Sequence, residues 1–518
     1  MAVNTQRLKY VLVIGLVAIV AVALLWQRAG EEGPPPEQGS INGVAIQQWT
    51  TEKGARVLFV PTPQLPMVDI RILFDAGSAR DGDASGLARL TSILLDHGAG
   101  EWDTNTIAAR FEDVGAQFGT GARRDMASVS LRSLTEPELL EQALATMQAV
   151  LQQPRFEESE LERERRRMLI GLQNELQSPA SIAERRFYAT LYGTHPYAAM
   201  PSGTPETVGA LTVKQVRDFY RRYYVARNAT VAIVGALDRE QAESIAARLM
   251  DGLAEGEAAP ALPTPPPLDE AVAGETIHVA YPSAQSHIRM GALGVFRGDP
   301  DYFPLYVGNH ILGGSGFSSR IVEEIREERG LAYSSYSYFL PMRVPGPFVV
   351  GMQTRDDQSG EALALLKKTI ADFVAQGPTP EELAHAKKNI TGGFPLRVDS
   401  NSDIVGYIGM IGFYRLPLDY LQTFNEKVEA VTLAQIRDAF GRRVDVARMA
   451  TVVVGKTAPT PPPAAEPGEA APAPPVPEPE PAPEPAPEPA PPPAPEPTPA
   501  PEPAPLPAQP SPQGSGGD

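Results

Sequence analysis

Side chains suited to metal chemistry are few in this chain, and their spacing does not favour a site. There are six histidines and no cysteine, so thiolate zinc sites, disulfides and cysteine nucleophiles are all excluded. No two histidines lie four residues apart, the spacing that would place both imidazoles on one face of a helix. The residues alone therefore offer no site built on paired histidines.

Two histidines do have a glutamate four residues away. His97 precedes Glu101, but the intervening Gly98-Ala99-Gly100 is expected to break a helix. We therefore expect His97 to be a surface or capping residue that follows a helix. His385 lies four residues after Glu381, and a single pair of this kind is typical of a solvated helix face.

The elements that must position such side chains alternate between strand and helix patterns. Residues 57–60 and 68–74 have the composition of strands. Helical apolar spacing is found at residues 86–95, 103–114, 136–151 and 157–176. An α+β fold is therefore predicted.

The chain contains this unit twice. Residues 211–235 read LTVKQVRDFYRRYYVARNATVAIVG, and residues 431–455 read VTLAQIRDAFGRRVDVARMATVVVG. Each segment has a helix with a QxRD core, then a strand, then a glycine, and such self-similarity indicates repeated structural units. We predict two homologous domains at residues 43–253 and 275–456, joined by a Pro- and Ala-rich linker at 254–274.

The N-terminal end has the pattern of a membrane segment. Residues 10–26 are uncharged and follow a short basic segment, 1–9. A helix of that length spans roughly 25 Å, close to a ~30 Å hydrocarbon core. We expect a transmembrane signal anchor, with 1–9 cytoplasmic and the body membrane-anchored on the exported, periplasmic side. Cleavage as a signal peptide remains open, since Ala21-Val22-Ala23 resembles a cleavage site.

Two further segments have compositions that cannot form a core. Residues 27–42 are predicted to be a polar linker. Residues 457–518 form a Pro-, Glu- and Ala-rich tail, which is predicted to be extended and disordered. This tail contains eight glutamates and Asp518 but no Lys or Arg, so half of the net charge of −18 lies in it. An acidic chain of this kind lacks the basic face that nucleic acid binding needs.

Several short motifs together resemble the insulinase (pitrilysin) family of zinc metallopeptidases. They are the G-S-x-x-D…G-L-A pattern at 77–88, His195-Pro196-Tyr197 and GLAYSSYSYF at 330–339. With the duplication, the resemblance covers nearly all of residues 45–456. It implies two insulinase-type domains and a metallopeptidase ancestry.

The resemblance also implies a zinc site that this chain has lost. In the family, one helix carries HxxEH, with two histidine ligands and a glutamate general base, and the three positions here are Arg89, Ser92 and Ile93. The acidic pair that supplies the third ligand falls on Ile170 and Gly171. Zinc takes neutral imidazole or anionic ligands, so we expect no metal and no catalytic residue on this chain. Glu175 lies nearby, but it is displaced by about one helical turn.

The second half keeps a different family feature. An arginine and a tyrosine that contact substrate in the family map to Arg326 and Tyr333. Arginine donates a rigid fork of hydrogen bonds, and a tyrosine hydroxyl can stabilise an oxyanion. The alternative is a structural pair, with Arg326 bonded to Glu323 and Tyr333 packed. Two stretches are rich in glycine. Residues 311–316 could form a hinge or a close approach to a partner's chamber. Residues 115–125 match the position of the family's substrate-edge strand, and their glycines would weaken its pairing with a peptide.

The resemblance favours a non-catalytic, substrate-binding subunit of a heterodimeric, exported zinc metallopeptidase. A homologous partner would supply HxxEH and the zinc, and the pair would cleave extended peptides. Two alternatives remain open: a catalytically dead structural scaffold of the same fold, and a membrane-associated autonomous peptidase with an unrecognised site.

Overall fold

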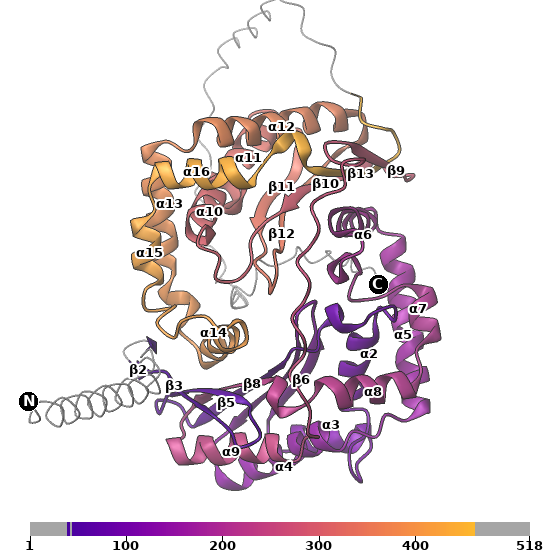
Figure 1. Cartoon of the computed structure of the whole chain (residues 1–518), viewed down its shortest axis with the longest axis vertical. Coiled ribbons are helices and arrows are strands. Elements are labelled where there is room, and N and C mark those ends of the chain that lie inside the picture. Colours follow the sequence, from indigo (N-terminus) through magenta and orange to yellow (C-terminus); the bar gives the residue numbers. More distant parts are fainter. Residues whose placement is uncertain (1–38, 42–43, 461–518) are drawn as a thin grey trace, which may run out of the picture.

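The computed structural model describes residues 39–41 and 44–460, which form two halves of the same α+β design (Figure 1). A short hairpin of β1 (Ser40–Ile41) and β2 (Val44–Ala45) precedes them. The strands of the first half are β3 (Gln47–Thr50), β4 (Arg56–Pro61), β5 (Met67–Phe74), β6 (Gln117–Ala122), β7 (Ala127–Leu134) and β8 (Ala229–Gly235). Its helices are α2 (Leu87–Leu94), α3 (Thr104–Glu112), α4 (Pro137–Gln152), α5 (Glu158–Leu176), α6 (Pro179–Tyr192), α7 (Pro205–Ala210), α8 (Val213–Tyr223) and α9 (Arg239–Asp251).

The second half repeats the pattern with fewer strands. Its strands are β9 (Thr276–Ala280), β10 (Gln285–Leu293), β11 (Ala332–Phe339), β12 (Pro347–Arg355) and β13 (Ala450–Gly455). Its helices are α10 (Tyr302–Asn309), α11 (Arg320–Val322), α12 (Ser359–Gln376), α13 (Pro380–Gly393), α14 (Asn401–Tyr414), α15 (Phe424–Ala430) and α16 (Leu433–Arg443).

The two sheets have the same topology. The first has the order β3-β4-β8-β5-β7-β6 and the second, read from its other end, β9-β13-β10-β12-β11. Within each sheet one pair is parallel, β4 with β8 and β9 with β13, and the other pairs are antiparallel. The second sheet lacks only an equivalent of β3. The predicted duplication into two homologous α+β domains is therefore confirmed.

The repeated sequence segments fold alike for a local reason. At the start of α8 the Thr212 side chain accepts from the amide of Gln215, whose side chain accepts from the amide of Thr212, and Thr432 and Gln435 repeat this capping box at α16. Each helix leads into a wholly buried strand, β8 or β13. An inner strand of each sheet therefore follows a helix that begins with the same capping box.

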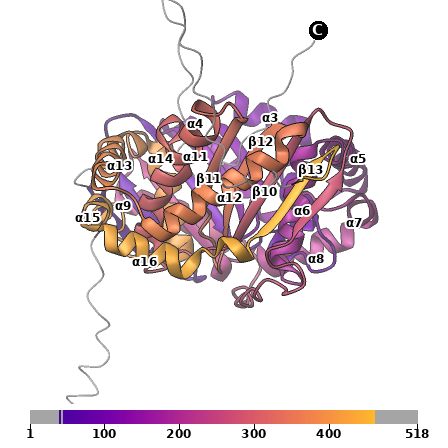
Figure 2. The same ribbon diagram turned by 90° about the horizontal axis from the view of Figure 1, so that it is seen from above.

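The two halves exchange one helix each. α6 of the first half packs on β10 and β13 of the second, while α14 of the second packs on β5 and β8 of the first (Figures 1 and 2). Glycine permits the close approach. A Cβ at Gly412 would lie 2.6 Å from both Leu58 Cδ1 and Thr230 Cγ2, and a Cβ at Gly291 would lie 2.8 Å from Phe187 Cζ. The exchange buries both sheet faces and fixes the halves against one another.

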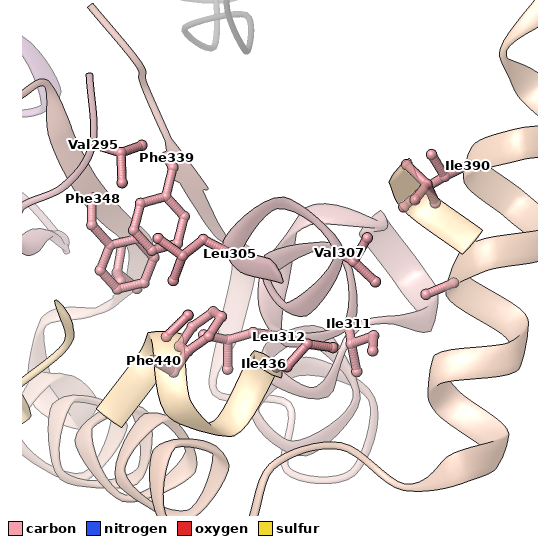
Figure 3. Packing of buried hydrophobic residues seen from close by; sticks show 14 of the residues in the cluster. Val295, Leu305, Val307, Ile311, Leu312, Phe339, Phe348, Ile390, Ile436 and Phe440 are labelled. Carbon is pink, nitrogen blue, oxygen red and sulfur yellow. The ribbon is translucent and has the colours of Figure 1, made fainter. Parts of the chain in front are cut away.

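The core of the second half forms where α10 and α16 meet β11 and β12 (Figure 3). Phe339 and Phe348 stack with ring centroids 4.4 Å apart, and Phe440 meets Phe339 edge-on at 5.9 Å. Leu305 and Ile436 complete this layer without any exposed surface. Such aromatic pairs add to the free energy gained by burial and fix the angle of α16 on the sheet.

The expectation of a transmembrane helix is corrected. No helix formed by residues 39–41 and 44–460 is long and apolar enough to cross a bilayer. The longest, α5, has 19 residues but is charged along much of its N-terminal half. The predicted span at 10–26 lies outside the described residues, as do 1–9, most of the 27–42 linker and the tail from 461 onward. The membrane-anchored, periplasmic location that rested on that helix is withdrawn.

Candidate functional site

The start of α2 is held by a buried carboxylate. Asp81 Oδ2 accepts from the amide of Gly86 and Oδ1 from the amide of Ala88, each at 2.8 Å. Burial raises the pKa of Asp81 to about 7, while these hydrogen bonds act to lower it. Gly86 adopts a φ of 99°, which favours glycine. The loop before α2 is therefore fully formed, although α2 carries none of the HxxEH side chains.

The positions of the lost zinc site lie on two helices, α2 and α5, that pack together. On α2, Arg89 is exposed, Ile93 is half-buried, and Ser92 is buried. On α5, Ile170 is 60% exposed. These side chains offer zinc no ligand beyond one buried hydroxyl, so they do not fit the metal.

Neither the neighbouring acidic side chain of Glu175 nor the rest of the described residues supplies replacement zinc ligands. A Cβ at Gly171 would meet nothing within 4 Å, so this position too presents no side chain. Glu175 is engaged by Arg185, and Ser202 Oγ donates to its Oε2 at 2.9 Å. Across residues 39–41 and 44–460, no three His, Cys, Asp or Glu side chains are grouped to hold a metal.

His97 has a different environment from the one expected. It lies at the end of α2 with Nδ1 3.0 Å from Asp96 Oδ1 and Nε2 3.2 Å from Glu164 Oε1 on α5. Burial alone would lower its pKa, but the hydrogen bond to Asp96 and the charges of Asp96 and Glu164 outweigh it and raise the pKa. The imidazole is thus an internal link between α2 and α5. His97 and Glu164 lie 67 positions apart, so no local sequence signal indicated this contact.

The His195-Pro196-Tyr197 motif serves the junction between the halves. The Tyr197 hydroxyl donates to Oδ1 of Asp125, a fully buried carboxyl whose pKa is raised by burial. From the second half, the Tyr414 hydroxyl and the Arg343 amide each donate to Asp125 Oδ2 at 2.9 Å. In the sequence, this motif indicated a protein family but not the hydrogen bonds to Asp125, because the groups that meet at Asp125 come from distant segments of the chain.

The outer strand β6 lies beside α2 and pairs on one side only, with β7. It contains Gly119 and Gly121, as the sequence indicated, and its side chains are half-exposed apart from the exposed Gln117. A strand edge of this kind presents unpaired backbone groups that can align an extended peptide. Its equivalent in the second sheet is β11, which also forms an outer edge.

Tyr333 lies on β11 at that second edge, and Arg326 lies in a π-helical turn, Glu323–Glu327, that packs on β11. Tyr333 is 74% exposed and sits on β11, where the register shifts between Ala332 and Ser334. The guanidinium of Arg326 lies 4.7 Å from the centroid of Phe317, and its Nε is 3.4 Å from Glu327 Oε1. Arg326 therefore pairs with Glu327, not with Glu323 as the structural alternative predicted, and Tyr333 is not packed.

Two π-helical turns precede this edge, at His310–Gly314 and Glu323–Glu327. The first is the glycine-rich stretch for which a hinge or close approach was expected. A Cβ at Gly313 would lie 2.4 Å from Ser337 Oγ, so the glycine permits close contact with β11. The second carries Arg326. Turns of this type recur at functional sites because they change the direction of side chains within a helix.

A duplicated α+β fold with peptidase-type helices and no metal ligands at the matching positions defines a class of metallopeptidase-like proteins that lack the catalytic site. The chain belongs to the insulinase (M16) peptidase family. Residues 56–204 match the family described as insulinase (peptidase family M16), and residues 210–390 match the peptidase M16 inactive domain.

Relatives and solved structures agree with this assignment. The chain is 40% identical to the peptidase M16 inactive domain from Pseudomonas fluorescens, with a TM-score of 0.77 over 80% of this chain and 99% of that chain. It is 25% identical to the non-peptidase homolog YmxG of Helicobacter pylori, over 77% of this chain and 91% of the relative. It is 23% identical to the uncharacterized zinc protease YmxG of Bacillus subtilis, over 69% and 85%.

Proposed function

We propose that this chain is the non-catalytic, substrate-binding subunit of a heterodimeric zinc metallopeptidase. The partner is a homologous chain that carries HxxEH and the zinc, and the complex cleaves extended peptides. The observation that carries the proposal is the accessibility of these two side chains. Tyr333 on β11 is 74% exposed, and Arg326, in the π-helical turn before β11, stacks on Phe317 and pairs with Glu327. Accessible polar side chains beside a free strand edge suit contact with a substrate or another chain.

The two side chains have distinct tasks in this proposal. Arg326 donates hydrogen bonds to a peptide carbonyl near the scissile bond, for which its planar fork is suited. Tyr333 directs its hydroxyl at the oxygen that becomes negatively charged as the carbonyl is attacked. The partner's zinc, when bound, polarises that carbonyl and activates water. The side chains at Arg89, Ser92, Ile93 and Ile170 take no part in catalysis.

A structural scaffold of the same fold is the second candidate. The observation that favours it is the local environment of Arg326, because a stacked and ion-paired arginine is also what a purely structural segment contains. The two candidates differ in what they require of Tyr333. A scaffold has no use for its hydroxyl, whereas the substrate-binding subunit loses rate without it.

The test is reconstitution. The full chain is mixed with an HxxEH-bearing homologue from the same organism, sought first in the neighbouring reading frame, and hydrolysis of an extended fluorogenic peptide is followed. We expect this chain alone to be inactive, the homologue alone to be slow, and the mixture to form a complex with strongly increased turnover. Absence of a complex, or equal turnover with and without this chain, contradicts the proposal.

A further inference from the structure

Between the two halves lies a cavity of about 520 Å³ with an unusual charge composition. Four arginines line it: Arg71 from β5, Arg123 directly after β6, and Arg297 and Arg397 from the second half. No aspartate or glutamate is among its lining residues. A cavity with this lining has a positive potential with no internal counter-charge.

The arginines are not neutralised elsewhere. Within the described part of the chain, none of the four lies within 4.0 Å of a carboxylate, although Arg397 Nη1 donates to the Tyr306 hydroxyl at 3.0 Å. Arg71 lies against α14, since a Cβ at Gly406 would be 3.7 Å from its Nη1. Burial, and then the charge of Arg123, lower the pKa of Arg71. Two neighbouring guanidinium groups that repel one another are stabilised by an anion placed between them.

The rest of the wall suits an organic ligand. Six tyrosines line the cavity: Tyr302, Tyr306, Tyr336, Tyr338, Tyr407 and Tyr420. Leu73, Met126, Met410 and Phe424 add apolar surface. Walls of this type accept the carbon skeleton of a ligand, and a few placed polar groups set its orientation.

We propose that this cavity binds a peptide carboxylate between Arg71 and Arg123, so that the subunit selects peptides with an acidic group. The inference rests on the proposed function, since it names the substrate class. A guanidinium binds a carboxylate through two parallel hydrogen bonds. The position also fits an extended peptide: β6 ends at Ala122 and the next residue is Arg123, so a peptide paired with the free edge of β6 reaches the cavity.

The experiment is calorimetric titration of the full chain, without a partner, in a buffer free of carboxylates. The probes are acetyl-Ala-Val-Ala-Glu-Ala-Val-Ala-amide, the same peptide with Gln in place of Glu, and the Gln peptide with a free C-terminus. We expect the Glu peptide to bind at least ~10-fold tighter than the capped Gln peptide, as a charge-assisted pair requires. A matching gain for the free C-terminus assigns the site to the terminal carboxylate and equally supports the proposal.

Variants locate the binding. Arg123→Gln, at an exposed position where folding is not at risk, should remove the preference for Glu, and Arg71→Gln should do the same. Arg221→Gln is the matched control, because Arg221 is exposed on α8 and does not line the cavity. Equal binding of the Glu and capped Gln peptides, an unchanged preference in Arg123→Gln, or saturable binding of inorganic phosphate without peptide discrimination overturns the inference. Because no hydrolysis is measured, this failure is separate from failure of the heterodimer proposal.

Discussion

The hydroxyl of Tyr414 on α14 lies 2.9 Å from Oδ2 of Asp125, and this hydrogen bond links the two halves of the molecule. Asp125 is fully buried and also accepts from Tyr197 and from the Arg343 amide. A buried carboxyl needs such donors, because each one lost leaves part of its desolvation penalty unmatched. The relative position of the halves, and with it the cavity between them, depends on this group.

Removing that hydroxyl should destabilise the fold. Tyr414→Phe keeps the ring and is expected to lower the free energy of unfolding by about 1–3 kcal/mol. Tyr188→Phe is the control, because the buried Tyr188 hydroxyl has no hydrogen-bond partner within the described residues and its removal should cost little. Denaturant unfolding measures both, and equal losses in the two variants would contradict the role given to Asp125.

The close packing of α14 on the first sheet gives a second prediction. Gly412→Ala should destabilise the protein by about 1–3 kcal/mol, because the added Cβ would lie 2.6 Å from Leu58 Cδ1 and Thr230 Cγ2. Gly441→Ala on α16 meets nothing within 4 Å and should be stabilising by up to ~1 kcal/mol through helix propensity. Thermal unfolding of the two variants should therefore shift in opposite directions. A stabilised Gly412→Ala variant means that α14 does not pack as described.

The link between His97 and Glu164 predicts a pH dependence. The pKa of His97 is raised in the folded protein, so its contribution to stability is complete below the unfolded pKa and is lost as the pH rises through the folded pKa. His97→Gln should therefore lose stability relative to wild type at about pH 5.5, and lose less at about pH 8.5. The measurement is the free energy of unfolding of both proteins at both pH values. A difference that grows with pH has the wrong sign and rejects the assignment.

Metal analysis tests the lost site directly. Protein purified without chelator is expected to hold no stoichiometric zinc, because Arg89, Ser92, Ile93 and Ile170 include no imidazole or carboxylate. An HxxEH-bearing homologue prepared in parallel is the positive control. One tightly bound zinc per chain would show that the described residues contain a site that the geometry does not reveal.

Local patterns in the sequence predicted the elements closely and the tertiary contacts poorly. The helix expected at 157–176 is α5 at Glu158–Leu176, and the strand expected at 68–74 is β5 at Met67–Phe74. Periodicity and capping are local properties, so they can be read from neighbouring residues. The duplicated segments ending at Gly235 and Gly455 also indicated the matching sheets.

The tertiary contacts that the sequence did not indicate join residues that lie far apart in the chain. Asp125 and Tyr414 lie 289 positions apart, and they meet where α14 packs on the sheet of the first half. The prediction for the environment of His97 was wrong for the same reason, because its partner Glu164 lies on another helix. At the site itself, neither the π-helical turn that carries Arg326 nor the register shift beside Tyr333 was predicted from the sequence. The transmembrane helix was inferred from the uncharged run at 10–26 and its basic flank, which lie outside the described residues, and no helix of residues 39–41 and 44–460 is long and apolar enough to span a membrane.

The measurement closest to the central claim is turnover by reconstituted heterodimers that carry Tyr333→Phe or Arg326→Ala. Tyr333→Phe removes one oxygen from a side chain that is 74% exposed, so folding and complex formation should be unchanged. Turnover should fall by on the order of 10²–10³, the usual loss for an oxyanion donor. Arg326→Ala should also weaken peptide binding, whereas Arg329→Ala, an exposed arginine of the same segment, should have no effect on either quantity. Complexes of both variants that cleave peptide at the wild-type rate would contradict the account and assign the pair a structural role.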